Sequence, residues 1–124
     1  RWPGHVPAGA VSPRVTGFED WLPTLAALCG ATAPAGDGVS FAATLRGEQQ
    51  PDRPFLYREF AGYGGWQAVW QGRWKLLRRQ LQTPEKATTE LYDLVADPGE
   101  SKDVAAAHPD VVRELLAIAA REHA

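Results

Sequence analysis

Aromatic and basic side chains alternate within residues 67–79, which read QAVWQGRWKLLRR. The cations beside Trp70 and Trp74 are Arg73, Lys75, Arg78 and Arg79, with Lys86 further along. Cations next to aromatic faces bind anions, sugars or nucleic-acid bases, so the segment is a candidate interaction surface. The more common interpretation is a strand with solvated cations whose tryptophans anchor a small core.

Metal chemistry would need several converging ligands, and the spacing of the candidate ligands is unfavourable. His5, His108 and His123 are not paired on one helical turn, and Cys29 has no second cysteine beside it. We therefore expect no metal site built by this chain alone. Cys29 lies in the apolar run LAALCG, where burial is the usual state of a free thiol.

The sequence also lacks a residue pattern typical of nucleophilic or acid–base catalysis. The serines lack the glycine elbow that presents a catalytic hydroxyl. Asp97 and Glu100 flank Pro98-Gly99, and this pattern fits a solvated turn better than an acid–base pair. We expect no catalytic and no cofactor-binding residue in this chain.

Composition is that of a globular chain, with 124 residues, 44% hydrophobic and 23% charged residues. The net charge of −2 gives no field that would attract nucleic acid or an anionic membrane, so we expect neither partner. No apolar run approaches the roughly 20 residues that span a bilayer. The chain begins with Arg1 and has no methionine, which favours a fragment or a processed chain.

Prolines and glycines break residues 1–14 and predict an extended, turning path. A helix is expected over about residues 20–29, with Asp20 as N-cap, Pro23 in the first turn and Gly30 after the end. Turn signals then continue, and a boundary between two structural units is expected near residues 47–54.

Short strands are predicted in FLYREF, WQAVW, RWKLLRR and ELYDL. With Gln71-Gly72 as a two-residue turn, Val69 would pair with Trp74, and Val69, Trp74 and Leu76 would share the core face of the sheet. Apolar periodicity over about residues 109–122 predicts an amphipathic helix laid on this sheet.

Several motifs also occur in the order of a known family: RWPG, DWLPTLAALCGA, the Asp37-Gly38 pair, AVWQGRWKLL, ELYDLVADPGES and a following HP. Together they resemble the C-terminal part of sulfatases of the arylsulfatase type, in the alkaline-phosphatase superfamily. The resemblance implies an α+β chain. Residues 1–48 would be the tail of a larger α/β catalytic domain, and residues 49–124 a small subdomain with a four-stranded antiparallel sheet and a packed terminal helix.

The same resemblance implies a parent enzyme that hydrolyses sulfate esters with calcium and a formylglycine made from a C-x-P-x-R motif. Cys29 is followed by Gly-Ala-Thr-Ala, so this motif is absent. Calcium, formylglycine and the catalytic residues are then expected in an N-terminal catalytic domain, which would be the partner of this chain. The chain alone is expected to be inactive and to close the substrate pocket of the parent.

In this family loops of the small domain can border the substrate pocket. The segment EFAGYGGW is rich in glycine and aromatic residues, and Tyr63 and Trp66 are our candidates for the pocket rim. Three alternatives stay open at this point. The parent could hydrolyse phosphate or phosphonate esters, the chain could be a free-standing module that binds an anion or sugar through Trp66 and Trp70, or it could be an excerpt that self-associates through its first helix.

Overall fold

The computed structural model describes residues 1–123, which form two compact units divided between Arg53 and Pro54. The first unit holds the short helical turn η1 (Phe18–Asp20) and helices α1 (Trp21–Leu28) and α2 (Ala42–Leu45). The elements of the second unit are β1 (Leu56–Phe60), β2 (Trp66–Gln71), β3 (Trp74–Arg79), η2 (Pro84–Lys86), β4 (Thr88–Asp93), η3 (Ala105–Ala107) and α3 (Pro109–Glu122).

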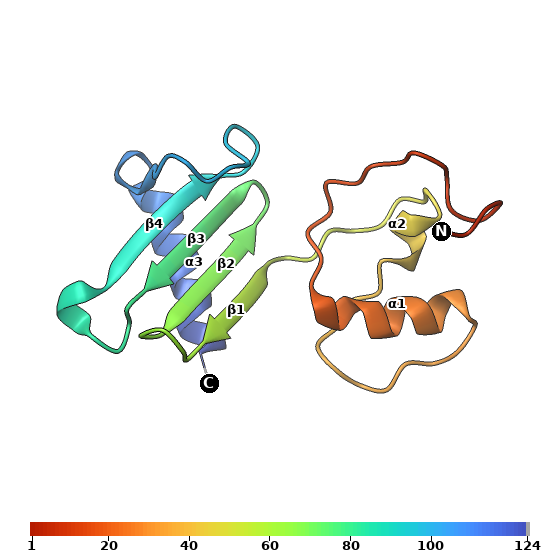
Figure 1. Cartoon of the computed structure of the whole chain (residues 1–124), viewed down its shortest axis with the longest axis horizontal. Helices are drawn as coiled ribbons and strands as arrows, with labels where there is room; N and C mark the ends of the chain where they lie inside the picture. The colour runs from red at the N-terminus through yellow and green to blue at the C-terminus, as the bar shows by residue number, and fades with distance from the viewer. Residues whose placement is uncertain (124) are drawn as a thin grey trace. The chain divides into compact units, whose positions relative to one another are not determined.

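The second unit is a four-stranded antiparallel sheet with a helix on one face (Figure 1). Strand order follows chain order, β1-β2-β3-β4, and every pair of neighbours is antiparallel. Helix α3 packs across β1, β2 and β3. The expected α+β class, with its sheet and terminal helix, is therefore confirmed.

The core of the second unit lies between α3 and one face of the sheet. Val69, Leu76 and Leu91 from three neighbouring strands are fully buried there against Leu115 and Ala119 of α3. Burial of each large side chain contributes about 1.5–3 kcal/mol relative to exposure. The helix begins at Pro109. Proline has no N–H, and none is needed here because the N–H of the first helical residue has no acceptor within the helix.

The β2–β3 hairpin differs from the expected register by two residues. Its turn residues are Gly72 and Arg73, so Val69 pairs with Leu76 and not with Trp74. Gly72 has φ +56°, and it occupies the first central position of the turn, where type II′ hairpins place glycine. A shift of two residues keeps each side chain on its face, because side chains alternate with a period of two. The expected core residues Val69 and Leu76 are thus correct although their pairing was wrong.

In the first unit Asp20 occupies the expected N-cap position of α1, but its side chain makes no capping hydrogen bond to that helix. Its buried carboxylate instead accepts hydrogen bonds from the backbone nitrogens of Gly17 (2.8 Å) and Val39 (2.7 Å) and from Arg53 Nη1 (3.0 Å). Thr24 adds a second link, because its hydroxyl accepts from the Phe41 nitrogen at 2.9 Å. Buried polar contacts therefore join the segments of this unit.

Helix α1 buries Thr24 and leaves three of its large apolar side chains exposed. Trp21 is 46% exposed, Leu22 59% and Leu25 52%. Cys29, expected to be buried, is exposed at the end of the helix, because no described segment of this unit covers that side. Among residues 1–123, no helix is long and apolar enough to cross a membrane.

Candidate interaction surface on the sheet

The sheet face opposite α3 carries two tryptophan–cation pairs, and we call it the open face of the second unit. Trp66 lies directly across the β2–β3 ladder from Arg79, and Trp70 lies across from Lys75. The Arg79 Cζ atom is 5.1 Å from the centre of the Trp66 ring, and Lys75 Nζ is 5.2 Å from the Trp70 ring. A hollow of about 520 Å³ opens here, lined among others by Arg58, Phe60, Trp66, Trp70, Arg79 and Glu100.

Most cations of the hairpin are paired, whereas the sequence suggested largely solvated cations. Lys75 Nζ contacts both carboxylate oxygens of Glu100, at 2.6 and 2.7 Å. Arg73 Nε donates to Asp93 at 2.8 Å, and Arg78 donates to the Gln67 side chain at 2.7 Å. The neighbouring strand β4 and the turn after it supply the two carboxylates. Only the folded sheet brings them beside β3.

Of the two predicted rim residues, Tyr63 lies in the connection between β1 and β2, and Trp66 is the first residue of β2. Tyr63 is 83% exposed, and its carbonyl accepts a hydrogen bond from the Trp66 indole at 3.3 Å. The Phe60 and Tyr63 rings lie 6.1 Å apart, so three aromatic side chains gather at one end of the sheet. The assignment of Tyr63 and Trp66 to a substrate pocket stays a prediction.

This β1–β2 loop is fastened by the segment that follows β3. Gln82 donates from its side chain to the Ala61 carbonyl and from its backbone to Gly64, both at 2.9 Å. The Leu81 nitrogen donates to Gly65 at 3.2 Å. No sequence pattern predicts the role of Gln82, because its contacts depend on the β2–β3 register.

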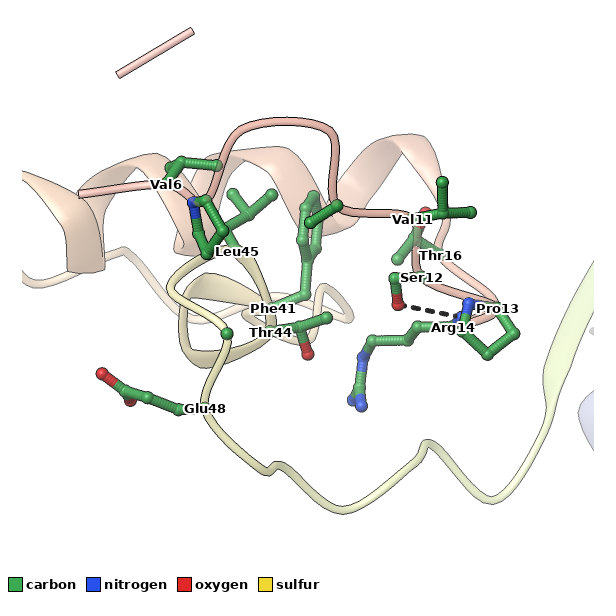
Figure 2. A pocket seen from close by; sticks show the side chains of 13 residues that line it. Val6, Val11, Ser12, Pro13, Arg14, Thr16, Phe41, Thr44, Leu45 and Glu48 are labelled. Carbon is green, nitrogen blue, oxygen red and sulfur yellow. Dashed lines mark hydrogen bonds between the residues drawn. The ribbon is translucent and has the colours of Figure 1, made fainter. Parts of the chain in front are cut away.

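The first unit contains a separate pocket of about 420 Å³, shown in Figure 2. Its wall is mostly apolar and includes Phe41 and Leu45. Arg14 is held by the Pro51 carbonyl at 2.8 Å and by Asp52 at 3.2 Å, and the Ser12 hydroxyl accepts from the Arg14 nitrogen. With these groups engaged in local bonds, the pocket offers no nucleophile activated by a base.

Comparisons with known proteins find similarity to several sulfatases. The chain is 29% identical, over 128 aligned positions, to N-acetylgalactosamine-6-O-sulfatase of Bacteroides thetaiotaomicron, covering 93% of this chain and 24% of that enzyme. It is 34% identical over 99 positions to a Delta 4,5-hexuronate-2-O-sulfatase of the same bacterium, covering 69% of this chain and 18% of the relative. The chain is related to the sulfatases.

A solved structure from work on glycosaminoglycan metabolism by Bacteroides thetaiotaomicron agrees, with a TM-score of 0.61 and 29% identity. The alignment covers 82% of this chain and 24% of the solved chain. No protein-family model matches. The expected resemblance to the C-terminal portion of an arylsulfatase-type enzyme is confirmed, and the sulfatase-related chain spans about a quarter of the length of its first relative.

Each histidine of this sulfatase-related chain contacts a different partner. His108 packs on Trp74 with ring centres 4.8 Å apart, and His5 packs on Trp2 at 4.1 Å. His123 Nδ1 lies 2.9 Å from Glu59 and joins the end of α3 to β1. Within the described part of the chain, no three histidine, cysteine or acidic side chains group as metal ligands.

The carboxylate of Glu59 has a lowered pKa. The Tyr57 hydroxyl and then His123 hydrogen-bond to it, and they lower the pKa of Glu59 below its usual 4.5. Burial and the Glu59 contact raise the pKa of Tyr57 to about 12. Glu59 therefore stays ionised and Tyr57 neutral near pH 7. This arrangement links the end of α3 to β1.

Proposed function

We propose that this chain is a non-catalytic C-terminal portion of a sulfatase whose parent enzyme hydrolyses sulfate esters. The observation that carries the proposal is the similarity to sulfatases over 93% of this chain but only 24% of the relative. On this proposal residues 1–48 belong to the tail of the catalytic domain, and residues 49–124 form the small subdomain. The chain completes the fold of the parent and closes its substrate pocket.

The residues present do not fit the cofactors of such an enzyme. Cys29 is followed by Gly30 and Ala31, so it lacks the C-x-P-x-R motif from which formylglycine would be made. The described residues include no three-ligand group for a divalent cation. We propose that calcium and formylglycine belong to the remaining part of the parent, and we assign no reaction step to this chain.

The remaining part of the parent is also the proposed partner of α1. Phe18, Leu22 and Leu25 are 90%, 59% and 52% exposed around this helix. Contiguous exposed apolar surface of this kind usually marks an interface. In the parent enzyme the catalytic domain would cover this surface, and in the isolated chain a second copy would compete for it.

Activity measurements on two proteins test the proposal. Hydrolysis of a generic aryl sulfate with calcium is compared between this chain and the full-length product of its gene. We expect activity in the full-length protein and none in the 124-residue chain. Activity in the chain would contradict the proposal, and a preference of the full-length protein for phosphate or phosphonate esters would favour a different hydrolase of the same superfamily.

The proposed rim is tested in the same full-length protein. Tyr63→Ala and Trp66→Ala are expected to alter the preference among sulfated substrates, because both side chains would border the pocket. An unchanged preference in both variants would remove the rim assignment without affecting the rest of the proposal.

A further inference from the structure

We propose that Gln82 is a positioning residue, which holds the β1–β2 loop (residues 61–65) in one conformation and thereby fixes the place of Tyr63. The inference rests on the proposed function only in its last step, where the place of Tyr63 affects the affinity of the parent enzyme for its substrate. Gln82 itself would touch neither the substrate nor the reacting atoms.

Tyr63 is strained and exposed at the same time. Its φ of +52° lies in the left-handed region, which bulky residues rarely adopt. Tyr63 is 83% exposed, so burial of the ring does not compensate for this strain. Strained residues of this kind gather at functional sites and persist only where their surroundings impose the conformation. Hydrogen bonds to the loop are the contacts that can impose it here.

Gln82 bonds to the loop on both sides of Tyr63. Its side-chain Nε2 donates to the Ala61 carbonyl at 2.9 Å, before Tyr63 in the chain. Its backbone nitrogen donates to the Gly64 carbonyl at 2.9 Å, directly after Tyr63. Gln82 therefore bridges the two ends of the strained segment.

The residues beside Gln82 and Tyr63 are shaped for this close contact. Gln80 Nε2 lies 3.4 Å from the Tyr63 carbonyl. Gly64 has φ +86°, and a Cβ atom at this position would lie 2.2 Å from Gln80 Oε1. Glycine at position 64 thus allows both the backbone conformation and the approach of the segment that follows β3.

The side chain of Gln82 is the part of the bridge that a substitution removes. The backbone bond to Gly64 does not depend on the identity of residue 82, whereas the bond to Ala61 does. Gln82 is exposed, so its replacement should leave the core of the second unit intact. We expect the loop then to sample other conformations while the sheet stays folded.

Order in the loop affects binding more than reaction. A loop that is ordered before the substrate arrives need not be ordered on binding. If the released loop adopts the binding conformation for about a tenth of the time, the apparent affinity falls about tenfold. Molecules that bind still react at the same rate, so KM rises and kcat does not change.

Relaxation of ¹⁵N amides in the 124-residue chain measures the order of the loop. For residues 61–64 we expect order parameters of about 0.85 in the unchanged chain and below about 0.6 in Gln82→Ala. Gln82→Glu keeps the side-chain length, but its carboxylate cannot donate to the Ala61 carbonyl, so it should loosen the loop equally. Gln82→Lys keeps a donor and should restore the order.

A matched control changes a glutamine outside this contact. Gln49→Glu alters an exposed glutamine of the first unit and should leave the order parameters of residues 61–64 unchanged.

The same variants in the full-length product of the gene test the functional step. The probes are p-nitrophenyl sulfate and N-acetylgalactosamine 6-sulfate, each with calcium. We expect Gln82→Ala and Gln82→Glu to raise KM by about three- to tenfold. Their kcat should stay within about twofold, and Gln82→Lys should restore KM.

Each failure has its own signature. An equally ordered loop in Gln82→Glu and the unchanged chain would overturn the positioning role, whatever the full-length protein does. A loosened loop with unchanged KM would overturn the step from loop order to substrate affinity. If the full-length protein hydrolyses neither probe, the proposed function fails, and the relaxation measurements alone decide the role of Gln82.

Discussion

The carboxylate of Asp20 accepts a hydrogen bond from Arg53 Nη1 at 3.0 Å, and it thereby joins the start of α1 to the last residue of the first unit. Asp20 is 2% exposed, and the Arg53 side chain is 11% exposed. The backbone nitrogens of Gly17 and Val39 share the same carboxylate. One buried side chain therefore connects three segments of a unit that has few buried apolar residues.

Replacement of Asp20 should destabilise the first unit strongly. Asp20→Ala leaves Arg53 and two backbone donors without their acceptor, and we expect a loss of about 3 kcal/mol. Urea unfolding combined with amide hydrogen exchange along α1 measures this. Asp52→Asn is the matched control, because Asp52 is 87% exposed and its pairing with Arg14 should contribute less than about 1 kcal/mol. Equal effects of the two variants would refute the role given to Asp20.

Leu115 should carry much of the stability of the second unit. It is fully buried between α3 and the sheet, so Leu115→Ala removes apolar contacts and leaves a cavity. We expect a loss of about 2–5 kcal/mol in the free energy of unfolding. Val95→Ala serves as the control, because Val95 is 72% exposed and should change stability by less than about 0.5 kcal/mol. A loss below about 1 kcal/mol for Leu115→Ala would show that α3 is not packed as described.

Stability should decline in acid because ionised carboxylates hold the turns of the second unit. Asp97 accepts hydrogen bonds from the nitrogens of Lys102 (2.9 Å) and Ser101 (2.7 Å), and these lower the pKa of Asp97 below its usual 3.8. A lowered pKa in the folded state means that stability is complete above pH 3.8 and is lost as the pH falls through the folded value.

The variant Asp97→Asn tests this pH dependence. It should unfold at lower urea than the unchanged chain at pH 7, and the difference should shrink as the pH falls below 3.8 and the native carboxyl becomes protonated. Glu114→Gln, on the exposed side of α3, should show no such convergence. A difference that is constant with pH would mean that the charge of Asp97 does not matter.

Self-association of the isolated chain should depend on α1. Leu22→Lys combined with Leu25→Lys places two charges on the exposed apolar surface and should lower the sedimentation coefficient toward that of a monomer. The control Val11→Lys changes a side chain that is 94% exposed and lies outside this surface. A chain that stays monomeric at high concentration without any substitution would contradict this use of the surface.

Local sequence patterns were sufficient to predict the helices and strands and the face of the sheet that is buried. Alternation in the strand segments and the apolar period after Pro109 were sufficient, because side-chain direction repeats every two residues in a strand and about every 3.6 in a helix. The expected helices over about 20–29 and 109–122 correspond to α1 (Trp21–Leu28) and α3 (Pro109–Glu122). Tyr63 and Trp66 were close in sequence, so their contact needed no tertiary information.

Only the tertiary structure decided which residues distant in sequence come into contact. A turn at Gln71-Gly72 would have placed Trp66 across from Leu77, whereas the observed turn places it across from Arg79. Both registers satisfy the same apolar pattern, because a shift of two residues changes the partners and not the faces. The tryptophan–arginine pair, the Gln82 contacts and the Asp20–Arg53 link all depend on such long-range placement. The sequence by itself determined which faces are apolar, and the folded chain determined which charges meet on them.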